Sequence, residues 1–228
     1  MLEAALQRNP KLKTIYDRVK DIPPVDAGHD FSHTVRVAKL AAKIVSEEAF
    51  RQERIQASDA MIDGAIASAL MHDCVPVPKN SPLRKESARL CSEKAQEWLW
   101  ELQWEPVEQI QEITGAVLDH SYSGGRVPTT LLGQALQDAD RLEALGALGL
   151  YRTIATGVSM GTTLFDVMDP WAEHRSLDDK RFTIDHFFTK LLKLPETFRT
   201  KAAQEEAKSR ANYLQGFLDQ LRHEIQIN

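Results

Sequence analysis

Cysteine is scarce in this sequence of 228 residues, which contains only Cys74 and Cys91, and the two form no Cys-x-x-Cys pair. A disulfide framework and a cysteine-rich metal clip are therefore excluded. No apolar run approaches the roughly 18 residues that a membrane-spanning helix needs. The N-terminus contains Glu3 and Arg8 and no apolar signal segment. We therefore expect a cytoplasmic protein with no membrane partner.

An excess of basic charge is also missing. The formal net charge is -5, because 33 Asp and Glu residues outnumber 28 Lys and Arg residues. Proteins that bind nucleic-acid polymers carry a basic stripe or patch, whereas the basic residues here are spread among acids. A nucleic-acid partner is thus disfavoured. A small phosphorylated molecule is compatible, because a metal ion and a few local Lys or Arg side chains can neutralise it.

Strand-like alternation is absent, and helical periodicity dominates. We predict an all-α fold, a helical bundle with an irregular and partly helical C-terminal lobe. We expect one domain over residues 1–228, with a metal-binding core over about 25–155 and the lobe over about 156–228. A homodimer is compatible with this organisation. The predicted helices cover residues 2–19 with a break at Pro10, 32–49, 58–72, 85–102, 106–120, 129–155, 181–192 and 196–225.

The sharpest chemical signal is the pair His72-Asp73 at the end of a predicted helix. The pair continues the apolar stripe of that helix, which consists of Ile62, Ala65, Ile66 and Ala69. Burying an aspartate is costly unless a partner compensates for the lost hydration, and a divalent cation would do so. A capping aspartate beside a core histidine would give the same pattern, so a metal site requires further ligands.

A second histidine, His33, begins another apolar stripe, which continues through Val37, Leu40 and Ile44. It is therefore expected to face inward from the first turn of its helix, with Asp30 as the N-cap. Alternatively, His29 and His33 form a His-x-x-x-His pair like that of zinc peptidases, with Asp30 in place of the usual glutamate. The proline- and glycine-rich approach favours a position of His29 outside the helix.

Two acids, Asp138 and Asp140, lie in the predicted helix over residues 129–155. That helix is apolar on both arcs, and each acid shares a stripe with leucines and alanines. Periodicity therefore cannot choose between them. One is expected to bind a metal and the other to pair with a base.

Together these segments resemble the HD-domain superfamily of metal-dependent phosphohydrolases, whose ligands follow the order His, adjacent His-Asp, distant Asp. The matching segments are Asp30-x-x-His33-x-x-Arg36-Val37, His72-Asp73 and Ala139-Asp140-Arg141-Leu142. The resemblance implies an HD-domain helical bundle and a metal site formed by His33, His72, Asp73 and Asp140. It thus selects Asp140, which periodicity could not.

Further segments are similar to a bacterial group of stand-alone HD hydrolases, and the similarity covers about residues 25–195. These segments are Gln137 to Gly149, His120-Ser121-x-Ser123 and Asp169-Pro170 through Arg181. Members of the group are described as phosphohydrolases, and nucleotide pyrophosphohydrolase activity is associated with some relatives.

The resemblance implies hydrolysis of a nucleotide, or another small phosphate ester or anhydride, by a metal-activated water. Mn²⁺ or Mg²⁺ is the expected ion, with Fe²⁺, Co²⁺ or Ni²⁺ as alternatives. Lys79 and Arg84 lie in a proline-rich loop after the His-Asp pair, from which they would clamp phosphate. We assign catalytic roles to Asp73, His120 and Lys79, and substrate contacts to Lys79, Arg84, Asp138 and Arg141.

Two other functions compete with phosphohydrolysis. The first is a catalytically weak HD module that senses a nucleotide. The second is an HD-fold di-iron oxygenase, for which His120 is the only further histidine in reach. Cys74 stands where the family usually has an aliphatic residue, and we interpret it as a small buried hydrophobe rather than a nucleophile.

Overall fold

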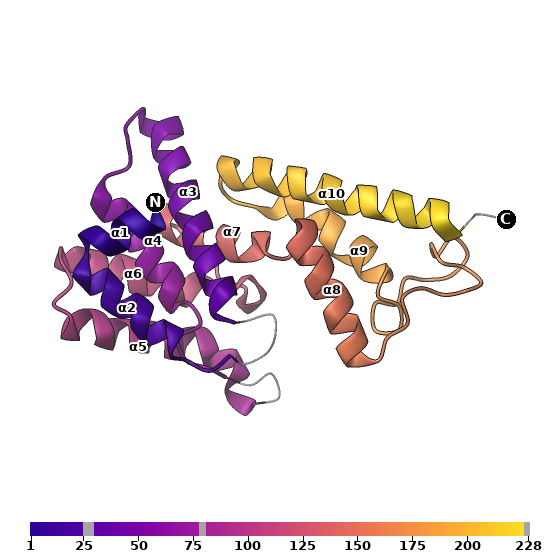
Figure 1. The fold of residues 1–228 in the computed structure, drawn as a ribbon, viewed down its shortest axis with the longest axis horizontal. Coiled ribbons are helices and arrows are strands. Elements are labelled where there is room, and N and C mark those ends of the chain that lie inside the picture. The colour runs from indigo at the N-terminus through magenta and orange to yellow at the C-terminus, as the bar shows by residue number, and fades with distance from the viewer. Residues whose placement is uncertain (25–29, 78–80, 226–228) are drawn as a thin grey trace. The chain divides into compact units, whose positions relative to one another are not determined.

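The computed structural model describes residues 1–24, 30–77 and 81–225, and Figure 1 shows its helices. The α-helices are α1 (Leu2–Arg8), α2 (Pro10–Lys20), α3 (Phe31–Glu53), α4 (Asp59–Met71), α5 (Ser87–Glu101), α6 (Val107–Asp119), α7 (Leu131–Leu142), α8 (Gly146–Met160), α9 (Asp185–Thr189) and α10 (Lys201–Ile225). Short 3-10 helices are η1 (Pro82–Glu86), η2 (Tyr122–Gly124) and η3 (Leu191–Thr197). Within the described ranges there is no β-strand, only an isolated bridge between Thr163 and Phe182. The all-α prediction is confirmed.

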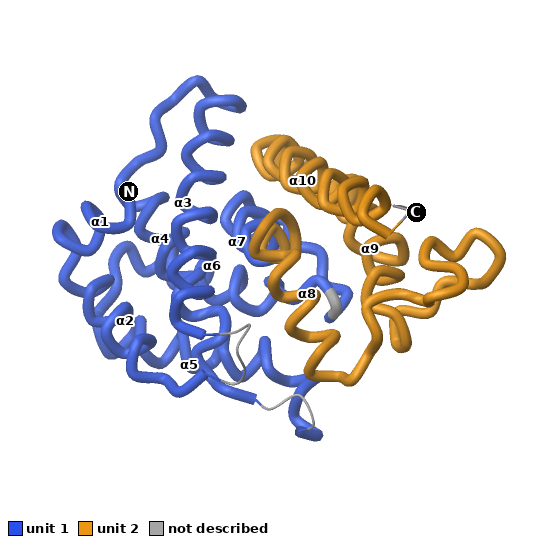
Figure 2. The backbone as a smooth tube through the Cα atoms, turned by 45° about the vertical axis from the view of Figure 1, so that its right-hand side comes forward, with its two compact units in different colours: residues 1–140 blue, residues 141–228 orange. Residues whose placement is uncertain are grey.

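The chain divides into two compact units, Met1–Asp140 and Arg141–Asn228, which Figure 2 colours separately. The predicted boundary between core and lobe, near residue 155, falls within α8 and remains a prediction. None of the described helices combines the length and the apolar character needed to span a bilayer.

Helix α4 forms the centre of the first unit. It packs against α3, α6 and α2, and every residue from Ile62 to Met71 is buried. Small side chains allow the neighbouring helices to approach it, while Ile66 and Leu70 fill the space between them. Truncating either of these two residues to alanine is expected to cost about 2–5 kcal/mol. Because α4 is buried along this length, His72, which directly follows it, also lies in the interior of the unit.

The break predicted at Pro10 is confirmed. Asn9 separates α1 from α2, and its side-chain oxygen accepts hydrogen bonds from the backbone N–H groups of Lys11 (3.0 Å) and Leu12 (3.2 Å). Pro10 occupies the first turn of α2, where its missing N–H costs no hydrogen bond.

The prediction of one helix over residues 129–155 is wrong, because the chain breaks between α7 and α8. Leu145 is extended, and Gly146 has a φ of 71°, in the left-handed region that glycine adopts most readily. A Cβ atom at position 146 would also lie 3.2 Å from Cγ of Arg210. The apolar periodicity continues across this break and therefore does not reveal it.

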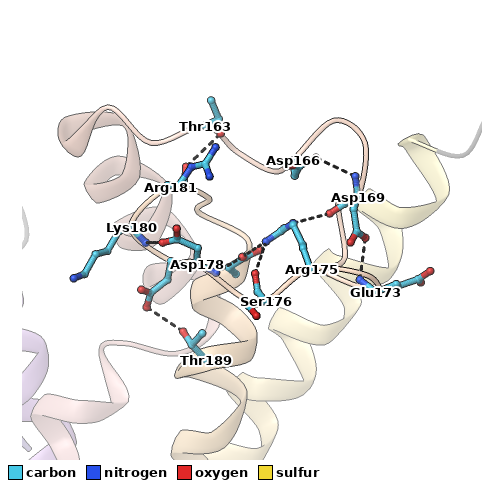
Figure 3. A network of polar contacts seen from close by, with 12 residues as sticks. Thr163, Asp166, Asp169, Glu173, Arg175, Ser176, Asp178, Lys180, Arg181 and Thr189 are labelled. Carbon is cyan, nitrogen blue, oxygen red and sulfur yellow. Dashed lines mark hydrogen bonds and ion pairs between the residues drawn. The ribbon is translucent and has the colours of Figure 1, made fainter.

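In the second unit, α10 packs against α8 and η3, and the segment between α8 and α9 is held by a polar network (Figure 3). The Arg175 guanidinium donates to both carboxylate oxygens of Asp185, at 2.5 and 2.9 Å. The backbone N–H of Asp178 donates to the same carboxylate at 2.6 Å. The helix predicted over residues 181–192 is confined to α9 and the start of η3, because the backbone of Thr183 donates to Thr163 across the bridge.

Candidate metal centre

His33 is placed by the cap of α3. The carboxylate of Asp30 accepts a hydrogen bond from the backbone N–H of His33 at 2.9 Å, which confirms Asp30 as the N-cap. The cap satisfies one of the free N–H groups at the helix start and fixes where the first turn begins. His33 is only 1% exposed, so its ring points into the unit.

His72 is the C-cap of α4 and is fully buried. Its Nδ1 lies 2.6 Å from the carbonyl oxygen of Ala69, one turn earlier. We assign the ring proton to Nδ1, because a carbonyl can only accept, and this leaves a lone pair on Nε2. The Nε2 atom has no hydrogen-bond partner among the residues that the structure describes. A buried nitrogen of this kind is unfavourable unless it has a ligand.

Asp73 follows directly and completes a cluster with the two histidines. Single ligand atoms of His33, His72 and Asp73 all lie within 4.8 Å of one another. The Oδ2 atom of Asp73 is 3.4 Å from Nε2 of His72. Two atoms that each bind one cation at about 2.1 Å are separated by about 3–4 Å, so the donor set fits a divalent ion.

Helix α7 brings a fourth group, Asp140, to the same place. Its Oδ1 lies 3.4 Å from Nε2 of His33 and 3.9 Å from Nε2 of His72. Asp138 is also fully buried, but it lies two residues earlier and hence about 200° around the helix. The structure therefore sets Asp140 beside both imidazoles, which periodicity could not specify.

The environment favours the protonation states that a metal site needs. Burial lowers the pKa of His72 and outweighs the opposing effect of the Asp73 and Asp140 charges. Burial acts to raise the pKa of Asp140, but the interactions with His33 and His72 are stronger together and hold it well below its usual range. A neutral imidazole beside an ionised carboxylate is the form in which these residues bind metal.

His120 reaches the cluster from the C-cap of α6. Its Nδ1 lies 2.6 Å from the carbonyl oxygen of Val117, an arrangement like that of His72 with Ala69. Its Nε2 is 3.9 Å from Oδ1 of Asp73, and its ring packs edge-on against His72 at 5.2 Å between centroids. The structure thus brings His120 beside Asp73.

Asp73 and His120 line a cavity of about 600 Å³. Its lining includes four basic residues, namely Arg84, Lys85, Arg89 and Arg126. Arg84 also lines a smaller adjoining cavity together with His33 and Asp73. Arg89 is paired with Glu86 and Glu93, whereas Lys85 is exposed.

Sequence reasoning missed Lys85 and Arg126 as candidates for the site. Lys85 follows Arg84 in η1, so the same loop argument could have included it. Arg126 carries no local signal, because only the chain's path between α6 and α7 brings it to this cavity. The amide of Gln137 in α7 holds that path, donating to the carbonyl oxygens of Asp119 (2.9 Å) and Arg126 (3.3 Å).

The contacts described so far do not include four other residues that the sequence analysis considered for the site. The guanidinium of Arg141 donates to the carbonyl oxygen of Thr197 at 2.9 Å, and it also lies over the ring of Phe198. Its role in substrate binding, like that of Asp138, remains a prediction. Lys79 and His29 lie outside the described residues.

Cys74, which directly follows Asp73, is 5% exposed. Its Sγ lies 3.6 Å from the carbonyl oxygen of Cys91, toward which it donates. The neighbouring Cys91 and burial together raise the pKa of the Cys74 thiol. A thiol of this kind is a poor nucleophile, which agrees with its interpretation as a small core residue.

The sequence profile of the HD domain matches residues 30–145. The matched range spans about half of the chain and contains His33, His72, Asp73 and Asp140. The chain therefore belongs to the HD domain family.

Individual relatives match most of the length of this chain. The uncharacterized protein YpgQ of Bacillus subtilis is 29% identical over 199 residues, covering 87% of this chain and 85% of that protein. The crystal structure of an HD-superfamily hydrolase from Bacillus thuringiensis is similar with a TM-score of 0.70 and 28% identity, covering 96% of this chain and 98% of the other. A crystal structure of YpgQ in complex with ADP has the same fold, with a TM-score of 0.66, 24% identity, and coverage of 95% and 96%.

Proposed function

We propose that this protein is a metal-dependent phosphohydrolase that acts on a nucleotide or another small phosphate ester or anhydride. The observation that carries the proposal is the cluster of His33, His72, Asp73 and Asp140, whose Asp73 lines a cavity together with several basic residues. Family membership supports the hydrolase class, and the relative from Bacillus thuringiensis is itself described as a hydrolase.

Two imidazoles and two carboxylates would hold the divalent ion. Two nitrogen and two oxygen donors suit Mn²⁺ or Fe²⁺ as well as Mg²⁺, and we propose Mn²⁺ or Mg²⁺ as the working ion. When bound, such an ion lowers the pKa of water and polarises a phosphoryl oxygen. The buried Nε2 of His72 has no hydrogen-bond partner among the described residues, which supports the assignment of this atom as a ligand.

The residues around the cluster would position the reacting groups. The carbonyl oxygen of Ala69 orients His72 through Nδ1, as outer partners of metal-binding histidines commonly do. Nδ1 of His120 contacts the carbonyl oxygen of Val117, and its Nε2 would transfer a proton to or from an oxygen at the Asp73 side of the cavity. Asp73 would serve both as a ligand and in orienting the attacking water.

The basic lining would bind the substrate. Arg84, Lys85 and Arg126 line the same cavity as Asp73, and guanidinium groups form strong, charge-assisted hydrogen bonds to phosphate oxygens. A volume of about 600 Å³ accommodates a molecule the size of a nucleotide. YpgQ has been crystallised with ADP, which makes nucleotides the first substrates to test here.

The test is a hydrolysis screen with metal-stripped protein. Nucleoside mono-, di- and triphosphates are supplied with Mn²⁺, Mg²⁺, Fe²⁺, Co²⁺ or Ni²⁺, and products are followed by chromatography. We expect turnover that depends on added metal, and its loss together with metal content in His72→Ala and Asp73→Ala. His223→Ala, at an exposed histidine, is the matched control and should behave as the wild type. Tight nucleotide binding without turnover under any metal would instead favour the sensor function.

A further inference from the structure

The second unit contains a cavity of its own, formed entirely by residues between Ala144 and Leu191. Its volume is about 350 Å³, within the range of small-molecule sites. None of the four proposed metal ligands lines it. Met160 and Leu191 contribute apolar walls to one part of the cavity, which suits the organic portion of a ligand.

Basic side chains dominate the charged part of this cavity. The cavity is lined by Arg152 from α8, Lys180 from the polar network between α8 and α9, and Lys190 from the end of α9. Asp179 is the only acidic residue in its lining. In a chain with a net charge of -5, this local positive excess is not a consequence of composition. A concave surface of one charge sign concentrates ligands of the opposite sign.

Arg152 is the most informative of these cations. Its side chain is half-buried, and it forms no ion pair or hydrogen bond with any residue that the structure describes. The network in Figure 3 engages Lys180 only through its backbone N–H, which donates to Asp178. Both side chains are therefore available to an external anion.

The single acid of the lining is already engaged by neighbouring residues. Oδ2 of Asp179 lies 3.0 Å from Nδ1 of His186 and accepts a hydrogen bond from the hydroxyl of Thr189 at 3.0 Å. These contacts reduce the repulsion that Asp179 would exert on an incoming anion. They also orient the His186 ring at the edge of the cavity, and its Nε2 has no hydrogen-bond partner among the residues that the structure describes.

Hydroxyl groups form another wall, and the backbone of α8 comes close to them. Oγ1 of Thr162 and Oγ1 of Thr183 are 2.7 Å apart. A Cβ atom at Gly157 would lie 2.3 Å from the hydroxyl of Thr183 and 2.9 Å from that of Thr162. Only glycine permits this approach, and hydroxyls can donate to phosphate oxygens.

We propose that this cavity is a second ligand site, which binds the phosphate group of a nucleotide or a related phosphorylated small molecule without a metal ion. Arg152 and Lys190 bind the phosphate, and the apolar walls at Met160 and Leu191 contact the organic part. The site goes beyond the hydrolase function proposed above, since it uses none of the metal ligands.

The experiment measures binding by calorimetry to full-length His72→Ala protein in EDTA, in which the metal centre is inactive. The probes are AMP, inorganic phosphate and adenosine. We expect AMP to bind, inorganic phosphate to bind more weakly, and adenosine not to bind. Arg152→Ala and Lys190→Ala, each made in the His72→Ala protein, should weaken AMP binding about tenfold or more, the typical effect of removing a hydrogen bond to a charged group.

Lys193→Ala is the matched control. Lys193 is an exposed lysine three residues from Lys190 and does not line the cavity, so its removal should leave AMP affinity unchanged. Circular dichroism verifies that each variant is folded, and the two cavity variants provide independent tests.

Several results would overturn the proposal. They are an absence of AMP binding, equal affinity for adenosine and AMP, or unchanged affinity in both cavity variants. Binding that is present in the wild type and lost in His72→Ala would assign the nucleotide to the metal centre instead. Because the assay contains no metal and measures no turnover, its failure leaves the proposed hydrolase function untouched.

Discussion

The two units each bury a charged cluster, but the two clusters differ in how their polar atoms are satisfied. In the second unit, the carboxylate of Asp185 receives two hydrogen bonds from Arg175 and one from the backbone of Asp178. In the first unit, Nε2 of His72 is buried and has no hydrogen-bond partner among the described residues. Both carboxylates nearest to it, those of Asp73 and Asp140, are 3.4 Å or more away.

We interpret this difference as one between a structural cluster and a cluster that binds a ligand. A buried polar group normally finds its partner within the protein, and one that does not requires a ligand or destabilises the fold. Arg175 and Asp185 complete each other and hold a segment without helical structure. In the proposed metal cluster, Nε2 of His72 has no such partner among the described residues, and we propose that a cation supplies it. Removing a residue from the first cluster should therefore reduce metal binding and activity, whereas removing one from the second should reduce the stability of the fold.

The largest expected effect comes from His72→Gln, which preserves most of the volume of the side chain. Losing a metal ligand should reduce hydrolysis at least about 1000-fold, since a catalytic ion contributes several kcal/mol to transition-state stabilisation. Added Mn²⁺ should raise the thermal midpoint of the wild type but not that of the variant, because only the wild type binds the ion in its folded state. Thermal scans with and without metal, together with turnover assays, measure both effects. A variant that retains metal-dependent turnover would contradict the assignment of His72 as a ligand.

The second prediction concerns Asp185→Ala. It leaves the partly buried Arg175 guanidinium, 19% exposed as a side chain, without its carboxylate. Breaking a buried ion pair in this way should cost about 3 kcal/mol. Urea unfolding followed by circular dichroism measures the loss, with the exposed residue Asp219 mutated to alanine as the control. Metal content should not change, so a joint loss of metal and stability would contradict the separation of the two clusters.

The third prediction is a pH dependence of the metal-free protein. Burial lowers the pKa of His72 in the folded state, so below about pH 6.5 the unfolded chain takes up a proton that the folded protein does not. The stabilising contribution is complete above that pH and is lost as the pH falls towards the folded-state pKa. Its slope is at most about 1.4 kcal/mol per pH unit.

Urea unfolding of the metal-free protein at pH 7.5 and pH 5.5 measures this dependence. His72→Gln should lose less stability between the two values than the wild type, while His223→Gln should match the wild type. Identical losses in all three proteins would show that His72 does not titrate differently in the two states.

The smallest expected effect concerns the two helix caps. Asp30→Ala and Ser58→Ala each remove an N-cap hydrogen bond, to His33 and to Met61 respectively, and each should cost about 1 kcal/mol. Only Asp30→Ala should also weaken metal binding, because its helix begins with a ligand. Metal titration of the two variants compares them, and equal affinities would indicate that the cap does not position His33.

The helix caps and the inward-facing histidines could be predicted from the sequence because the interactions involved are local. A cap joins residues three apart, and an apolar stripe repeats within two turns. Asp30, His33 and the pair His72-Asp73 were therefore accessible from the pattern alone. The break at Gly146 was not, because the hydrophobic pattern passes through it and the decisive neighbour, Arg210, is distant in the chain.

The remaining features of the site depend on the tertiary structure. Asp138 and Asp140 lie in equally apolar surroundings, and only the packing of α7 sets Asp140 within 3.9 Å of both histidines. His120 and Arg126 reach the same cavity because Gln137 fixes the chain between α6 and α7. The sequence by itself determined which residues face inward from their own helices. Only the tertiary structure decided which of them meet, because contacts between distant segments depend on how whole helices pack and not on any local period.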